Sequence, residues 1–136
     1  WERRAYDKFR AYGASKTANV LHMVELNRRY AEDGVQAVAV HPGVVGTSLA
    51  RYMTREDFGA LRSMAADNRD RGAVLDTILS PEQGAATQVW AATTAELDGA
   101  GSLYLADCAI RTDVAAYAMD EHHAARLWEI SETLCG

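Results

Sequence analysis

Tyr12 and Lys16 have the residue types and the spacing to carry out proton-transfer chemistry. Only two of the fourteen basic residues are lysines, and Tyr12 is the one tyrosine with a lysine four positions downstream. Positions i and i+4 share a helix face, so the pair would place an ammonium one turn from a phenol. A positive charge there favours the phenolate and suits a tyrosine to acid–base work near neutral pH. The alternative is a core tyrosine beside a solvated lysine.

The residues around the pair predict a helix, a buried strand and a loop. From Ala11 to Gly34, apolar residues recur at helical spacing and arginines gather late, which predicts a long helix, buried at its start and more exposed later. Val35–His41 is almost continuously apolar, as in parallel strands covered on both faces. Pro42 and Gly43 then end the strand. Loops at the carboxyl ends of such strands bind ligands in open α/β sheets.

This order of elements resembles the short-chain dehydrogenase/reductase family. The segments AYGASKTANVL, VAVHPGVVGTSL, SPEQGAATQVWAAT and LYLADC have counterparts, in the same order, in its retinol-dehydrogenase-like and WW-domain-oxidoreductase-like branch. The resemblance covers nearly the whole chain. It implies an α/β fold that is the C-terminal part of a Rossmann-like doubly wound parallel sheet with flanking helices. Residues 1–136 would then be the C-terminal half of a single NAD(P)-binding domain.

The resemblance also implies roles for particular residues. Tyr12 would give a proton to a carbonyl oxygen during reduction, or remove one during alcohol oxidation. Lys16 would make that phenol more acidic and hydrogen-bond the nicotinamide ribose. The loop would run past the nicotinamide of NAD or NADP, with backbone groups near the nicotinamide amide and Thr47 near the amide or a phosphate. The loop residues that match the family are Pro42, Gly43, Val45 and Thr47. The substrate would be a small molecule that carries a carbonyl or an alcohol.

Two features of that family do not occur in the sequence. There is no glycine-rich phosphate loop, and no strand-borne serine precedes Tyr12. In the family, these features and the residues that select NAD or NADP come before the Tyr-x-x-x-Lys helix. We therefore expect the chain to be half of a longer protein, and to be unstable and inactive alone. Two functions stay open: an NAD(P)-dependent oxidoreductase, and a non-catalytic binding or regulatory protein that keeps the fold.

Further elements are predicted downstream. Met53 to Ser80 is expected to form helical segments, either a substrate-binding lid as in the family or a plain pair of surface helices. Ser80–Pro81–Glu82–Gln83 is typical of a helix start. Ser102–Ala106 predicts a second strand. Asp120 is expected to cap the last helix. The apolar stripe of that helix is Ala124, Leu127, Trp128 and Leu134. Helices at this end of the family's fold often pack at oligomer interfaces, so the resemblance implies a possible homo-oligomer.

The histidines are expected to have structural places. His41, before the Pro-Gly turn, is interpreted as a strand-end hydrogen-bonding residue, and His22, inside the long helix, as a packing residue. His122 and His123 are adjacent and would point to different faces of a helix. Because no third ligand is spaced to join them, solvated histidines are favoured over a metal site.

Cysteine usage and charge bear on location and partners. Cys108 and Cys135 lack Cys-x-x-Cys spacing, and no signal peptide is present, which predicts free buried thiols in a reducing cytoplasm. The net charge is −5, with arginines alternating with acidic residues, which argues against nucleic-acid binding. No stretch of the sequence is long and apolar enough to cross a bilayer.

Overall fold

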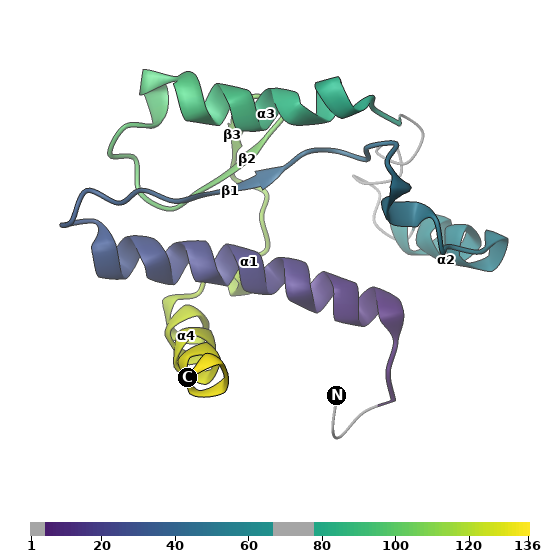
Figure 1. Ribbon diagram of the computed structural model, residues 1–136, viewed down its shortest axis with the longest axis horizontal. Helices are drawn as coiled ribbons and strands as arrows, with labels where there is room; N and C mark the ends of the chain where they lie inside the picture. Colours follow the sequence, from purple (N-terminus) through teal and green to yellow (C-terminus); the bar gives the residue numbers. More distant parts are fainter. Residues whose placement is uncertain (1–4, 67–77) are drawn as a thin grey trace. The chain divides into compact units, whose positions relative to one another are not determined.

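The computed structural model describes residues 5–66 and 78–136, which form an α/β chain (Figure 1). Within them, a mixed three-stranded sheet has the order β1–β2–β3. The elements are α1 (Lys8–Tyr30), β1 (Val38–His41), the 3-10 helix η1 (Ser48–Ala50), α2 (Arg55–Ala66), α3 (Pro81–Thr93), η3 (Ala95–Leu97), β2 (Leu103–Ala106), β3 (Ala109–Arg111), η4 (Ala116–Ala118) and α4 (Glu121–Cys135).

The chain divides into two compact units. The first contains residues up to Val40, Ala95–Leu105 and Ile110–Gly136, and thus α1 and α4. The second contains His41–Thr94 and Ala106–Ala109, and thus α2 and α3. Each unit is described by itself below. No helix among the described residues has the length and apolar character needed to cross a bilayer.

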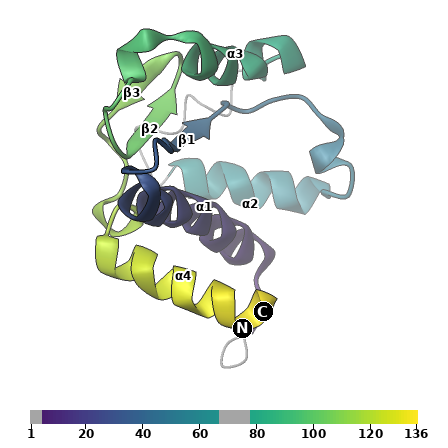
Figure 2. The same ribbon diagram turned by 60° about the vertical axis from the view of Figure 1, so that its left-hand side comes forward.

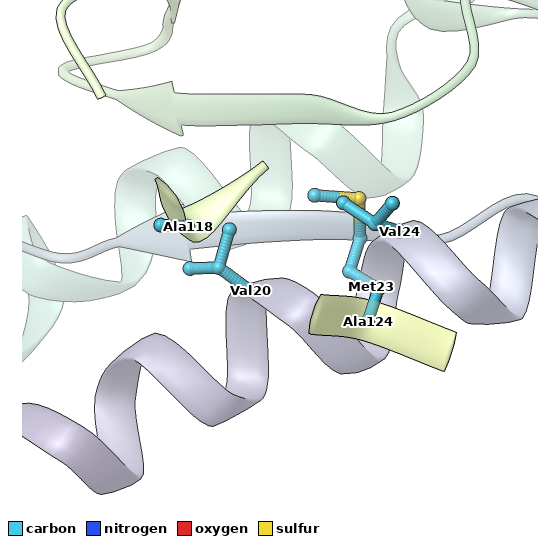
Figure 3. Packing of buried hydrophobic residues seen from close by; sticks show 5 residues of the cluster. All are labelled: Val20, Met23, Val24, Ala118 and Ala124. Carbon is cyan, nitrogen blue, oxygen red and sulfur yellow. The ribbon is translucent and has the colours of Figure 1, made fainter. Parts of the chain in front are cut away.

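The core of the first unit lies where α1 meets η4 and α4. Side chains from the second half of α1 pack with alanines of the C-terminal segment (Figure 3); the five residues are Val20, Met23, Val24, Ala118 and Ala124. α1 and α4 lie side by side (Figure 2). Asp120 caps α4 by accepting the His123 N–H at 2.7 Å, as predicted. Of the predicted apolar stripe of α4, Ala124 is fully buried, and Leu134 in the last turn is 80% exposed.

The long helix is confirmed, but the prediction that its start is buried is wrong. The first half of α1 is largely exposed, Tyr12 by 53%. Its buried residues lie between Val20 and Asn27, and the last residues, 28–30, are exposed as predicted. Even Glu25 is fully buried, because Arg28 donates to its carboxylate at 2.8 and 2.6 Å and Arg29 at 2.7 Å. The hydrogen-bonded Arg28 guanidinium, and then that of Arg29, lower the pKa of the Glu25 carboxyl to about 2. Arginines one turn away thus satisfy a charge that is costly to bury alone.

Asn27 joins the end of α1 to the segment before β1. Its amide donates to the Ala37 carbonyl at 2.8 Å and accepts the Ala37 N–H at 2.7 Å, as a neighbouring strand would. The same amide nitrogen donates to the Ser102 hydroxyl, just before β2, at 3.1 Å. Because a side chain takes both backbone groups of Ala37, β1 starts at Val38 and is shorter than the predicted strand Val35–His41.

The remaining strands form a hairpin. β2 confirms the predicted strand Ser102–Ala106 except for its first residue, whereas β3 was not predicted. The two-residue turn has positive φ at Asp107 (54°) and Cys108 (53°), as in hairpin turns that match strand twist. β2 and β3 are therefore antiparallel, and the mixed sheet pairs β1 with β2 in parallel.

In the second unit, α3 packs closely on the loop after β1. Ser80 and Gln83 form the predicted capping box: the Gln83 N–H donates to the Ser80 hydroxyl at 3.3 Å, and the Ser80 N–H to the Gln83 side chain at 2.8 Å. Gly84 is buried in the first turn. A Cβ at Gly84 would lie 2.5 Å from Cγ2 and 3.0 Å from Cγ1 of Val45. Only glycine lets the helix approach the loop this closely.

Other predictions in this unit are confirmed in part. The Thr47 hydroxyl accepts the Leu49 N–H at 3.3 Å and caps the short 3-10 helix η1. α2 lies within the helical stretch expected from Met53 to Ser80. Residues 67–77 of that predicted stretch lie outside the described residues.

Asn27→Ala in the complete protein should lower the free energy of unfolding by about 2–4 kcal/mol, because it leaves the backbone groups of Ala37 without partners. Urea denaturation measures the loss. The matched control is Asn19→Ala on the exposed part of the same helix, which should change stability by less than about 0.5 kcal/mol. Equal effects of the two substitutions would contradict the role assigned to Asn27.

Gly84→Ala should lower the free energy of unfolding by about 1–3 kcal/mol, because its methyl group would overlap the stiff Val45 side chain. The matched control, Gly59→Ala in α2, adds a methyl group in open space and should gain about 0.5–1 kcal/mol from helix propensity. Combining Gly84→Ala with Val45→Ala should recover most of the loss. No recovery in the double variant would mean that another contact requires the glycine.

Candidate active site

Tyr12 and Lys16 lie together on the exposed first half of α1. The Lys16 ammonium is 5.3 Å from the centre of the Tyr12 ring, so the two side chains share one helix face, as their spacing predicts. Asp7 positions this part of the helix by accepting the Arg10 N–H at 2.8 Å, which caps the first turn. Within the described residues, no carboxylate lies within ion-pair distance of Lys16.

This pair has the chemical groups for proton transfer to a ligand. Tyr12 offers a hydroxyl that can give or take a proton, and its side chain is more than half exposed. The Lys16 ammonium keeps its three N–H donors, because a ring face accepts no conventional hydrogen bond. A ligand oxygen that reaches this face can therefore meet a proton donor and a positive charge together.

The loop after β1 is held by backbone hydrogen bonds to Leu79. The Leu79 N–H donates to the Val44 carbonyl at 2.8 Å, and the Gly46 N–H donates to the Leu79 carbonyl at 2.9 Å. The bridge is parallel and pairs Leu79 with Val45. The Leu79 side chain also covers Gly43, where φ is +82° and a Cβ would lie 2.6 Å from Leu79 Cδ1. The positive φ favours glycine at position 43, and a Cβ there would displace the Leu79 side chain.

This pairing leaves one peptide pair of the loop open. Because successive residues of an extended chain direct their backbone groups to opposite sides, the N–H and C=O of Val45 point away from Leu79. Neither has a partner among the described residues. A donor and an acceptor side by side match a primary amide, which is the group at the nicotinamide end of NAD(P).

The other loop residues also fit such a ligand. Thr47 is exposed, and because its hydroxyl oxygen accepts the Leu49 N–H, its proton is available to a ligand acceptor. Pro42 is exposed beside Gly43, which has no side chain to block a ligand. The residues present therefore fit the nicotinamide end of the cofactor. Tyr12 and Lys16 belong to the first unit and this loop to the second.

Sequence reasoning missed Leu79 and Gly84, which hold the loop. Leu79 carries no motif, and it acts through backbone groups that any residue has. Gly84 had a signal, because a glycine inside a helical pattern indicates close packing. The predicted hydrogen bond of His41 is confirmed, since its Nδ1 accepts the Gly43 N–H at 3.1 Å.

Surface hollows lie away from these residues. One, of about 340 Å³, is on the outer face of α4 and is lined by Arg126, Glu129, Ile130, Thr133 and Leu134. Another, of about 250 Å³, is at the end of α1 and is lined by Asn27, Ala31, Gly34, Val35, Gln36, Gly99 and Gly101. Their polar groups offer no acid–base pair comparable to Tyr12 and Lys16, so we place the candidate acid–base pair on the open face of α1. The candidate cofactor-binding loop belongs to the second unit and is considered by itself.

The remaining histidines are His22, His122 and His123. His22 stacks on Trp128 with ring centres 5.1 Å apart, as a packing residue would, although it is itself exposed. His122 and His123 are also exposed. Among the described residues, no group of three potential ligands is placed to hold a metal ion.

Both cysteines are free, but the prediction that they are buried is wrong. Cys108 is exposed because it lies in the hairpin turn, where its N–H donates to the buried Thr87 hydroxyl at 3.2 Å. Cys135 is exposed in the last turn of α4.

Comparison with curated proteins identifies relatives over nearly the whole chain. Retinol dehydrogenase 14 from Homo sapiens is 34% identical over 98% of this chain and 37% of its own length. WW domain-containing oxidoreductase from Gallus gallus is 36% identical over 97% of this chain and 29% of its own length. Short-chain dehydrogenase/reductase prx1 from Penicillium roqueforti is 30% identical over 93% of this chain and 38% of its own length.

These matches agree with the motifs that the sequence carries. No family model matches the chain, and no solved structure matches it significantly. The chain spans less than half the length of the curated relatives, and it aligns with their C-terminal part. About a third of the residues are identical to those of these relatives over almost the whole chain. The relatives are of the same branch that the ordered motifs indicate, which supports common descent. The chain belongs to the short-chain dehydrogenase/reductase family.

Proposed function

We propose that this chain is part of an NAD(P)-dependent oxidoreductase that interconverts a carbonyl and an alcohol in a small molecule. The observation that carries the proposal is the Lys16 ammonium, which lies 5.3 Å from the centre of the exposed Tyr12 ring and has no described carboxylate partner. The relatives support it, because their names describe a retinol dehydrogenase, an oxidoreductase and a short-chain dehydrogenase/reductase.

In this proposal, Tyr12 moves the proton. During reduction its hydroxyl donates a proton to the carbonyl oxygen, and during alcohol oxidation the phenolate oxygen accepts one. The Lys16 ammonium stabilises the negative charge that remains on the phenol oxygen when the proton leaves. Its N–H donors can also bind ribose hydroxyls, for which a compact ammonium is better suited than a guanidinium fork.

The loop after β1 would hold the nicotinamide end of the cofactor, which supplies or accepts the hydride when bound. The open N–H and C=O of Val45 would pair with the amide, and Thr47 would donate to an amide or phosphate oxygen. Gly43, beside Pro42, lets the ligand approach the backbone. These groups would orient the cofactor without taking part in the proton transfer.

We propose further that residues 1–136 are the C-terminal half of a single Rossmann-like domain with a doubly wound parallel sheet. The parallel pair β1–β2 supports this arrangement. So does the exposed first half of α1, because a helix that carries a catalytic tyrosine needs a surrounding site. The greater length of the relatives leaves room for the other half of such a domain.

Tyr12→Phe in the complete protein should lower kcat by about 10²–10⁴-fold, because it removes the proton donor and keeps the ring. The dissociation constant for NAD(P) should change by less than about twofold, since the hydroxyl contributes little to ground-state binding. Steady-state kinetics with carbonyl and alcohol substrates and dinucleotide titration measure the two quantities.

The matched control is Tyr6→Phe, an exposed tyrosine that precedes the same helix and should keep full activity. Substantial turnover by the Tyr12 variant would contradict the acid–base role. A wild-type protein that binds NAD(P) but turns over no carbonyl or alcohol would instead favour the non-catalytic alternative.

A further inference from the structure

Arg51 places a positive charge at the end of the candidate cofactor-binding loop, within the second unit. It is the residue that directly follows η1. Its side chain folds back along that helix, so that Nη1 donates to the Ser48 carbonyl at 3.0 Å. Ser48 is the neighbour of Thr47, whose hydroxyl caps the same helix. The guanidinium is therefore held beside the residue next to Thr47.

The Tyr52 ring restrains the same guanidinium. The central carbon of the guanidinium lies over this ring, 4.6 Å from its centre. A ring face accepts no conventional hydrogen bond, so the Ser48 carbonyl is the one such acceptor that Arg51 meets among the described residues. Most of the five N–H donors of the side chain are thus open to a ligand. The two contacts also reduce the rotamer entropy that the side chain would lose on binding.

No carboxylate neutralises this charge. Within the described part of the chain, no carboxylate oxygen lies within ion-pair distance of Arg51. Other arginines there are paired with a carboxylate; these are Arg28, Arg29, Arg111 and Arg126. An arginine that is held in place but not neutralised has the planar fork of donors that phosphate oxygens accept in pairs.

We propose that Arg51 binds a phosphate oxyanion of NAD(P), at the diphosphate that joins the two nucleotides. The inference rests on the proposed function, in which Val45 pairs with the nicotinamide amide. Along a dinucleotide, the diphosphate is the first charged group after the nicotinamide ribose. Along the chain, Arg51 is the first charged residue after Val45. Thr47 lies between them and can donate to an amide or a phosphate oxygen.

The expected effect of removing the charge is a loss of cofactor affinity. Arg51→Gln keeps a polar side chain but cannot form a charge-assisted hydrogen bond. It should raise the dissociation constants for NAD and for NADP by about five- to thirtyfold each, because both carry the diphosphate. Between about 20 and 300 mM salt, the affinity of the wild type should fall more steeply than that of Arg51→Gln, because salt screens the attraction that the variant lacks.

The test is titration of the complete protein with NAD and with NADP at low and high salt. The matched control is Arg55→Gln, which removes the same charge four positions further on. Arg55 is exposed, and its side chain has no hydrogen bond or ion pair among the described residues. Its substitution should change either dissociation constant by less than about twofold. Thermal unfolding without cofactor distinguishes a loss of fold from a loss of binding.

The outcomes separate this inference from the proposed function. If Arg51→Gln binds both dinucleotides as tightly as Arg55→Gln does, the assignment of Arg51 is overturned while the oxidoreductase proposal stands. A loss confined to NADP would place Arg51 at the adenosine phosphate and overturn its place at the diphosphate. A loss with unchanged salt dependence would mean that the side chain acts by packing, which overturns the assignment too. A wild-type protein that binds neither dinucleotide overturns both proposals.

Discussion

The hydrogen bonds of the Asn27 amide are the interaction on which the arrangement of the first unit depends. They give α1 a fixed register against the segment before β1 and against Ser102 before β2. Another register would leave the backbone N–H and C=O of Ala37 without these hydrogen bonds, which is unfavourable for buried groups. The helix that carries Tyr12 and the strand that leads into the loop are thereby joined by one side chain. The core residues Val20, Met23 and Val24 belong to the same half of α1 as Asn27.

The candidate site uses two kinds of support. On α1, regular helical spacing alone brings Lys16 to the face of Tyr12, and the apolar contacts of the helix are made elsewhere, in its second half. In the loop after β1, backbone pairing with Leu79 and the absence of a side chain at Gly84 hold the chain. In both places polar groups stay open to a ligand. The packing contacts of α1 do not use Tyr12 or Lys16, and the pairing of the loop with Leu79 does not use the N–H and C=O of Val45.

Local patterns predicted the helix of Tyr12 and Lys16, the capping box of Ser80 and Gln83, and the hydrogen bond of His41, because these depend on residues close in sequence. The family followed from the order of motifs. The burial of Glu25 did not follow, because it depends on how Arg28 and Arg29 fold back onto the carboxylate. Leu79 and the short strand β3 were missed because backbone pairing leaves little trace in side-chain types. The exposure of Cys108 depends on a hairpin turn that was not predicted.

The central claim is that a positive charge at position 16 lets Tyr12 transfer a proton, and it can be tested by removing and restoring that charge. The measurement is turnover of the complete protein carrying Lys16→Cys, with Cys108 and Cys135 replaced by alanine because both are exposed. Aminoethylation of the new thiol, which rebuilds an ammonium of nearly the same length, should restore most of the lost kcat. Carbamidomethylation, which adds a neutral group, should not. Equal recovery with both reagents, or no loss in the unmodified variant, would contradict the account.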